Sequence, residues 1–371
     1  MSKLIYFHSG LVSHMDEFVT GEEYPDHIWF NLKRNGNGWG DHLCSRSIKL
    51  NTPWPLADSV STIPPIANHE TRFDIVLDEI AERFCLLVKQ TQRTPYIMWS
   101  GGIDSVSILV SLLRMADQQV LDKLVVICNQ SSVDENPYFY HTYIKNKLTT
   151  IDTDQFQITS ENYNKILLVN GDCAEMIFGS TYPYTLARHG QLDLIHESCK
   201  DDTILRRSMQ TKNSQVLDFT LDLIKQSIKH SPVPIETVYD FHWWHCFDFK
   251  IIDSLLRPLA YMTEHLTDEQ TADFFQNTFQ RFYMYPEMQI WSMLTRNARR
   301  ENMHIDCKYD AKKYIHAFDR NDFYLNNKQK WPSIVKYPAK QYIFAIDETL
   351  RRYSVANVQD RRMLGQWLGR I

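Results

Sequence analysis

A short polar string, Ser100-Gly101-Gly102-Ile103-Asp104-Ser105, combines residue types that can bind phosphate. The apolar run Tyr96–Trp99 before it is rich in strand-forming residues, and the apolar residues after it, from Val106 to Leu113, recur at helical spacing. The two glycines let the backbone turn sharply and approach a ligand without Cβ atoms in the way. A strand, a glycine turn and a helix N-terminus in this order direct several backbone N–H groups at one point, so the string predicts an anion site.

The helix dipole contributes only about 0.3–1 kcal/mol per charge, so further groups are needed beside the amides to hold a triphosphate. Ser100 and Ser105 offer hydroxyls, and Asp104 offers a carboxylate for Mg2+ that bridges phosphate oxygens. No lysine directly follows the glycines, so the string is not the G-x-x-x-x-G-K-[ST] phosphate loop, and we expect a lysine from elsewhere in the chain.

The elements that position this string form an α/β pattern. Three helices are predicted: one over Phe73–Lys89, one that begins directly after the string, and one from Asn136-Pro137 to Lys147. Strands are predicted at Tyr96–Trp99, Leu124–Ile127, Phe156–Ile158 and Ile166–Val169. We expect a parallel sheet with flanking helices. Residues between Ile158 and Ile166 are too few for a crossover helix, so that connection departs from the usual βαβ unit.

A second string, Asn170-Gly171-Asp172-Cys173-Ala174-Glu175-Met176-Ile177-Phe178-Gly179-Ser180, follows the last of these strands. The first string resembles the PP-loop of the ATP-pyrophosphatase superfamily. The second resembles the G-E-G-A-D-E-L-F-G-G-Y segment of asparagine synthetases and their relatives, with matches at Gly171, Ala174, Phe178 and Gly179 and acids kept at Asp172 and Glu175. It departs from that segment where Glu175 replaces Asp, Met176 replaces Glu, and Cys173 and Ser180 replace Gly.

This resemblance implies a PP-loop fold and an ATP-dependent, AMP-forming ligase that joins a carboxylate to an amine or ammonia. The amine donor would be a small molecule or come from a separate protein. Ser100, Gly101, Gly102, Asp104 and Ser105 would bind ATP, with Met98, Ile127 and Gly171 beside the adenine.

By the same resemblance, Mg2+ would lie on Asp104 and Glu175, and Asp172 would be the base that assists the amine. The family's late loop brings a lysine to the phosphates. Its spacing points to Lys330, with Lys328, two residues earlier, as the other choice.

The resemblance also gives a division of the chain. We expect an N-terminal α+β region over residues 1–70, a nucleotide-binding α/β core over 71–185 and a mainly helical synthetase part over 186–371. The family's glutaminase domain uses a cysteine after the initiator methionine, whereas Ser2 stands here, so glutamine hydrolysis is not expected.

Composition narrows the function classes. A net charge of -5 gives no overall attraction to nucleic acid or to anionic membranes, and no apolar run approaches a membrane span, so a cytoplasmic protein is expected. The 7 cysteines are scattered without a C-x-x-C pair, which predicts neither a disulfide framework nor a four-cysteine zinc site. His242, His245 and Cys246 share a predicted helix face, and we interpret them as aromatic core rather than zinc ligands.

Two other functions fit the same strings. One is a PP-loop enzyme that modifies a nucleotide or tRNA by adenylating a carbonyl oxygen, although the paired cysteines of sulfur-transferring members are absent. The other is a degenerate synthetase that binds a nucleotide or a partner without turnover, which the altered residues Glu175 and Met176 keep open.

Overall fold

The computed structural model describes residues 4–7, 45–48, 62–66, 69–179, 181–209, 214–250, 254, 262–263, 265–303, 308–328, 342–346 and 350–354. The chain divides into two compact units. Unit 1 comprises Met1–Ile63, Gly179–Glu264 and Tyr337–Ile371; unit 2 comprises Pro64–Phe178 and His265–Lys336. The division expected from the sequence was contiguous, whereas here each unit is assembled from separate stretches of the chain.

Unit 2 is built on a five-stranded sheet in the order β4-β3-β2-β5-β6. Its strands are β2 (Thr94–Met98), β3 (Val125–Cys128), β4 (Thr149–Asp152), β5 (Ile166–Asn170) and β6 (Phe279–Arg281). Every neighbouring pair is parallel. The carboxyl ends of the strands therefore lie at one edge, which is where open α/β sheets bind ligands.

Three predicted strands are confirmed as β2, β3 and β5, but the strand predicted at Phe156–Ile158 is wrong. The strand at this edge of the sheet is Thr149–Asp152. It is short and mostly exposed, so its sequence lacks the apolar run by which the other strands are recognised. Phe156 instead packs its ring 5.3 Å from that of Tyr96, and Ile158 is buried, so their apolar character reflects packing onto the sheet. Residues 153–165 contain turns and irregular backbone but no helix.

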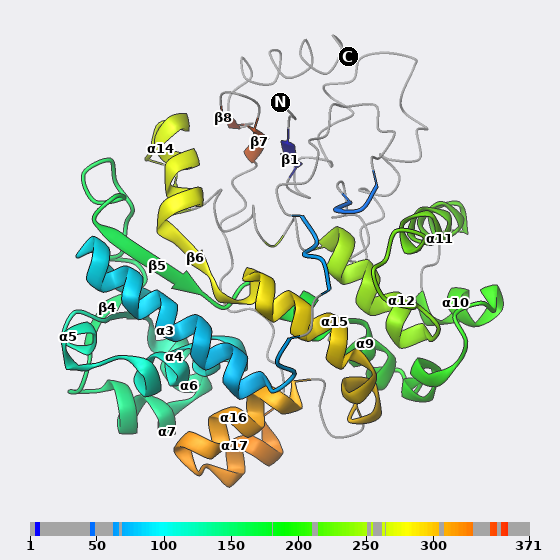
Figure 1. The fold of residues 1–371 in the computed structure, drawn as a ribbon, viewed down its shortest axis with the longest axis horizontal. Helices are drawn as coiled ribbons and strands as arrows, with labels where there is room; N and C mark the ends of the chain where they lie inside the picture. Colours follow the sequence, from blue (N-terminus) through cyan, green and yellow to red (C-terminus); the bar gives the residue numbers. More distant parts are fainter. Residues whose placement is uncertain are drawn as a thin grey trace. The chain divides into compact units, whose positions relative to one another are not determined.

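Helices flank this sheet along most of unit 2. They are α3 (Phe73–Thr91), α4 (Ile103–Met115), α5 (Gln118–Leu121), α6 (Gln130–Glu135), α7 (Pro137–Phe139), the π-helical turns η2 (Tyr140–Ile144) and η5 (Phe274–Thr278), α8 (Ala174–Phe178), α14 (Asp268–Asp273), the 3-10 turn η6 (Phe282–Met284), α15 (Pro286–Glu301), α16 (Tyr309–Asp319) and α17 (Asp322–Asn327). Figure 1 shows α3 crossing in front of the sheet, and α3 also packs against α4, α15 and α16.

The helices predicted before and after the glycine string are confirmed as α3 and α4. Their periodic apolar residues, such as Phe84 and Leu109, are buried. The helix predicted from Asn136-Pro137 is also confirmed at its start, where Asn136 is the N-cap and its side chain accepts a hydrogen bond of 3.1 Å from the Phe139 N–H. That helix ends at Ile144, earlier than the predicted Lys147.

Unit 1 contains a three-stranded antiparallel sheet in the order β1-β7-β8, made of β1 (Leu4–Phe7), β7 (Tyr342–Ile346) and β8 (Leu350–Ser354). Its helices are α9 (Thr181–Arg188), α10 (Asp202–Met209), α11 (Ser214–Ile228) and α12 (Val238–His245), with the 3-10 turn η3 (Leu192–His196) and the π-helical turn η4 (Cys246–Lys250). The part expected to be mainly helical, residues 186–371, therefore also contains the strands β6, β7 and β8.

The histidines of α12 lie in an aromatic core. His242, His245 and Cys246 are buried, and the Tyr182 ring stacks 4.6 Å from that of His242. The His242 Nε2 atom lies 2.8 Å from the Ser208 hydroxyl, and burial lowers the pKa of His242 to about 3. Among the residues that the structure describes, no group of three or more His, Cys, Asp and Glu side chains could hold a metal ion. The burial of His242, His245 and Cys246 confirms that they belong to the core.

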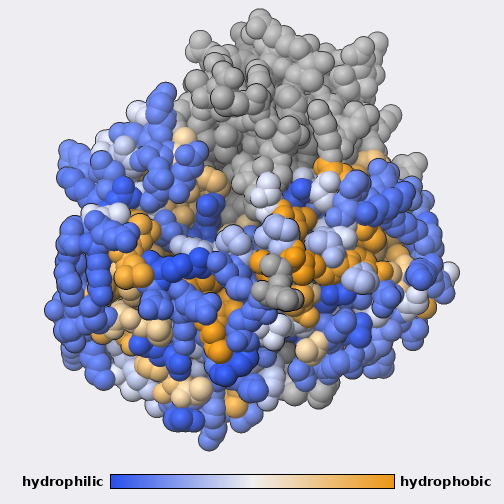
Figure 2. Space-filling model, in the orientation of Figure 1, coloured by the Kyte–Doolittle hydropathy of each residue, from blue (hydrophilic) through white to orange (hydrophobic). Residues whose placement is uncertain are grey.

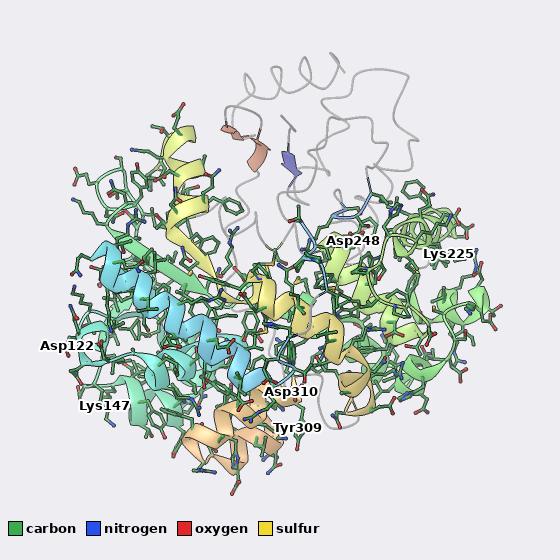
Figure 3. The ribbon with its side chains drawn as sticks, in the orientation of Figure 1. Asp122, Lys147, Lys225, Asp248, Tyr309 and Asp310 are labelled. Atoms are coloured by element: carbon green, nitrogen blue, oxygen red, sulfur yellow. The ribbon has the colours of Figure 1, made fainter. Side chains whose placement is uncertain are left out.

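Asp248, labelled in Figure 3, attaches residues 45–48 to η4. Its carboxylate accepts hydrogen bonds from the Ser45 hydroxyl at 2.6 Å and from the Arg46 N–H at 3.0 Å. Burial raises the pKa of Asp248, and these hydrogen bonds act in the opposite direction.

The viewed face of the molecule is mostly hydrophilic, with smaller apolar patches (Figure 2). Within the described part of the chain, no helix is both long enough and apolar enough to cross a membrane.

Candidate functional site

The glycine string forms the turn between β2 and α4, as predicted. Gly102 is the N-cap of α4 in an extended conformation, and Gly101 adopts a φ of 76°. A Cβ atom on Gly101 would lie 2.4 Å from the Ser132 carbonyl oxygen of α6, so both its φ and its packing require glycine. A Cβ on Gly102 would lie 3.2 Å from the Glu135 Oε1 and Ser100 Oγ atoms.

The two serines of the string hold the loop together. The Ser105 hydroxyl accepts a hydrogen bond from the Ser100 N–H at 3.0 Å and donates one to the Gly102 carbonyl at 3.1 Å. The Ser100 hydroxyl lies 3.0 Å from that of Ser105 and accepts a hydrogen bond from the Gly102 N–H at 3.3 Å. These hydrogen bonds fix the turn that precedes α4. The first backbone N–H groups of a helix have no acceptor within the helix, so those of α4 can bind an anion.

The predicted adenine residues lie at the ends of neighbouring strands. Met98 and Ile127 are register partners of β2 and β3, and the Trp99 N–H donates to the Ile127 carbonyl at 2.9 Å. Met98 is half-buried, whereas Ile127 is only 2% exposed. Of these two side chains, Met98 is the better placed to touch a bound base.

The turn after β5 lies against the glycine loop. A Cβ on Gly171 would lie 3.0 Å from the Asp104 Cβ and 3.1 Å from the Ser105 nitrogen. Since β2 and β5 are adjacent and parallel, the two strings singled out from the sequence converge at the carboxyl edge of the sheet. Asp172 is fixed there by Asn170, whose side-chain N–H donates to the Asp172 carboxylate at 2.5 Å.

Cys173 has a φ of 71°, a conformation that favours glycine, and the resemblance places glycine at this position. The turn therefore keeps the backbone shape of a glycine with a buried cysteine in its place. It leads into α8, whose first turn carries the half-buried Glu175.

Two lysines reach the glycine loop from a segment more than 200 residues later. Lys308 Nζ lies 2.5 and 2.7 Å from the two carboxylate oxygens of Asp104. Lys328 Nζ lies 2.7 Å from the Glu135 carboxylate, which is next to Gly102. Both lysines are buried, with 3% and 8% of their surface exposed. Lys330 lies outside the described residues, so its predicted role stays a prediction.

Two buried tyrosines complete the loop's surroundings. The Tyr324 hydroxyl of α17 donates to the Gly101 carbonyl at 3.4 Å, and burial raises the Tyr324 pKa well above its ordinary value. The Tyr283 hydroxyl lies 2.7 Å from that of Ser107 and 3.3 Å from the Asp104 carbonyl, and burial raises its pKa as well. Both phenols are therefore neutral at physiological pH.

Sequence reasoning had not assigned roles to Lys308, Glu135, Tyr324 and Tyr283. The contact of Lys308 with Asp104 has no local signature in the sequence, because the two residues lie in different parts of the chain. The meeting of the Asp104 and Glu175 carboxylates on one Mg2+ stays a prediction. Asp104 already attracts a cation, and carboxylate oxygens are the ligands that Mg2+ prefers, so this residue fits the ion.

Comparisons with protein-family models, curated proteins and solved structures give no match.

Proposed function

We propose that this chain is an ATP-dependent, AMP-forming carbon–nitrogen ligase similar to the synthetase part of asparagine synthetases. The observation that carries the proposal is the convergence of the glycine loop, the Gly171 turn and the two buried lysines at the carboxyl edge of a parallel sheet. A site with backbone amides, hydroxyls, acids and lysines has the groups that a metal-bound triphosphate needs.

In this proposal the glycine loop binds the ATP phosphates, and a substrate carboxylate attacks the α-phosphorus. The products of this step are an acyl-adenylate and pyrophosphate. An amine or ammonia then attacks the acyl carbon, the bond from that carbon to the AMP oxygen breaks, and an amide and AMP are released. Asp172, oriented by Asn170, accepts the proton that the amine loses. Asp104, with Glu175, would hold Mg2+, which would supply positive charge beside the phosphates.

Lysine side chains neutralise the charge that grows on the phosphates during the displacement. Lys308 and Lys328 are the described lysines at the loop, and both have stems held within the protein. A fixed cation in a water-poor site stabilises such charge better than a solvated one. We assign Lys308 to the phosphates next to Asp104, and Lys328 to holding Glu135 beside Gly102.

One observation favours a second candidate, a protein that binds a nucleotide without turnover. Lys308 engages both oxygens of Asp104, the residue expected to bind Mg2+, and a permanent ion pair there would prevent catalysis. The pyrophosphate assay separates the candidates. Release that depends on an acid supports ligation, release that depends on a nucleic acid supports nucleotide or tRNA modification, and nucleotide binding without release supports the binding protein.

A further inference from the structure

The ammonium of Lys308 has a second neighbour besides Asp104, the aromatic ring of Phe178. Lys308 Nζ lies 5.9 Å from the centre of this ring, within the distance of about 6 Å over which the face of a ring attracts a cation. The same atom lies 2.7 and 2.5 Å from the two carboxylate oxygens of Asp104. Lys308 and Phe178 are both buried, so the ammonium lies near an acid and a ring in a place that water barely reaches.

Three other aromatic rings hold the Phe178 ring in place. The centre of the Phe178 ring lies 5.6 Å from that of Phe73, 5.6 Å from that of Trp291 and 6.0 Å from that of Tyr283. Phe178 ends α8, which packs against α15, the helix that carries Trp291. Because this packing is dense, the ring cannot turn away from Lys308 unless its neighbours also move.

Tyr283 connects these rings to the helix turn that carries Asp104. Its hydroxyl lies 2.7 Å from that of Ser107 and 3.3 Å from the Asp104 carbonyl oxygen. The Ser107 hydroxyl also donates to the Asp104 carbonyl at 3.0 Å. The ring, the lysine and the acid are therefore all positioned against the first turn of α4.

The proposed function requires a second attraction for this lysine. If Asp104 binds Mg2+, its oxygens no longer neutralise the Lys308 ammonium, and a buried charge without a partner costs free energy. An aromatic ring attracts the ammonium but is no ligand for Mg2+, which takes oxygen ligands. The Phe178 ring thus continues to attract the lysine after the acid is used for the metal.

We propose that Phe178 is a positioning residue that keeps the Lys308 ammonium at the glycine loop when Asp104 binds Mg2+. This inference rests on the proposed function and deepens it, because it says how a buried lysine stays charged and close to the phosphates. Phe178 acts through Lys308. It belongs to the second string of the sequence, and Lys308 contacts an acid of the first, so the contact joins the two strings.

The test replaces Phe178 with 4-fluorophenylalanine and with 3,4,5-trifluorophenylalanine. Fluorine withdraws electron density from the face of the ring and weakens its attraction for a cation, while the size of the ring changes little. Calorimetry measures the affinity for ATP with Mg2+. We expect this affinity to fall stepwise with the number of fluorines, by about twofold to thirtyfold at three, the range of a cation–π contact. In Lys308→Met the same replacements should have no effect.

Phe84 provides the matched control. It is as buried as Phe178 and packs on an aromatic ring, that of Phe282 at 5.5 Å, but within the described part of the chain no cation lies over its ring. Fluorination of Phe84 should leave the affinity for ATP with Mg2+ unchanged. An equal loss of affinity from fluorination at Phe84 and at Phe178 would show a packing effect and overturn the proposal.

A second measurement needs no nucleotide. Trifluorination of Phe178 should raise the equilibrium constant of urea unfolding by about twofold to tenfold in the unaltered chain and leave it unchanged in Lys308→Met. An absence of this coupling, or a constant ATP affinity along the fluorine series, would overturn the proposal even in a chain that forms AMP. Coupling in a chain that does not bind ATP would refute the proposed function and keep the ring as the support of the lysine.

Discussion

Asp104 is the residue on which the candidate site depends, and its present partner is Lys308. Lys308 is 3% exposed on its side chain and Asp104 24%, so the pair is shielded but open on the side of the acid. A cation that approaches from that side competes with the lysine for the same oxygens. If Mg2+ binds Asp104 as proposed, it must displace the Lys308 ammonium from the carboxylate, and the lysine is then available for the phosphates.

Replacing Lys308 with Met should therefore have opposite effects on two ligands. Affinity for Mg2+ alone should rise roughly tenfold because Asp104 loses its competing cation, while affinity for ATP with Mg2+ should fall. The free energy of unfolding should drop by about 2 kcal/mol, less than for a fully buried pair. Calorimetric titration measures both affinities, and Lys313→Met is the control because Lys313 is exposed on the same helix. A lower Mg2+ affinity in Lys308→Met would contradict the competition.

The glycine loop is the element whose two glycines have separable roles. Gly101 is confined by its φ of 76° and by the Ser132 carbonyl, whereas Gly102 is extended and faces the side chains of Ser100 and Glu135. We therefore expect a side chain at Gly101 to destabilise the fold, and a side chain at Gly102 to fill the space next to the loop in which a ligand would bind.

Gly101→Ala should lower the free energy of unfolding by about 2 kcal/mol or more, through left-handed strain and the clash with α6. Gly102→Ala should change it by less than about 1 kcal/mol, while Gly102→Val should abolish the thermal stabilisation by ATP with Mg2+. That stabilisation is about 2.7 kcal/mol at 100 times the dissociation constant. Urea unfolding and thermal shift measure the two effects. A full ATP shift in Gly102→Val would remove this loop from the nucleotide site.

The sequence predicted the elements with strong periodic patterns and missed those without them. β2, β3 and β5 are apolar runs, and α3 and α4 carry long apolar faces, so each is recognisable locally. β4 and β6 are short edge strands whose conformation depends on pairing with β3 and β5. Lys308 could not be placed for the same reason, because tertiary contacts, and not a local pattern, bring it to Asp104.

At the scale of the whole molecule, acid stability depends on buried groups such as His242. Burial lowers its folded-state pKa to about 3, below the value of about 6.5 in the unfolded chain, so the neutral form stabilises the fold. This contribution is complete above about pH 6.5 and is lost as the pH falls from there toward 3.

Between pH 7 and pH 5, His242 alone should lower the free energy of unfolding by about 2 kcal/mol. His242→Gln should reduce this pH dependence, although it also lowers stability at pH 7. His141→Gln is the control because His141 is exposed and its replacement should leave the pH dependence unchanged. Chemical unfolding at both pH values measures the effect, and an equal pH dependence in His242→Gln and the unaltered chain would refute it.

The proposed ligase activity is tested most directly by the products formed from ATP. The chain is incubated with ATP, Mg2+, an amine donor and a set of carboxylic acids that includes dicarboxylates, and nucleotides and pyrophosphate are measured by chromatography. We expect AMP and pyrophosphate in equal amounts, formed only with an acid present and lost in Asp104→Ala. ADP and phosphate as the main products, or AMP formation that persists in Asp104→Ala, would contradict it.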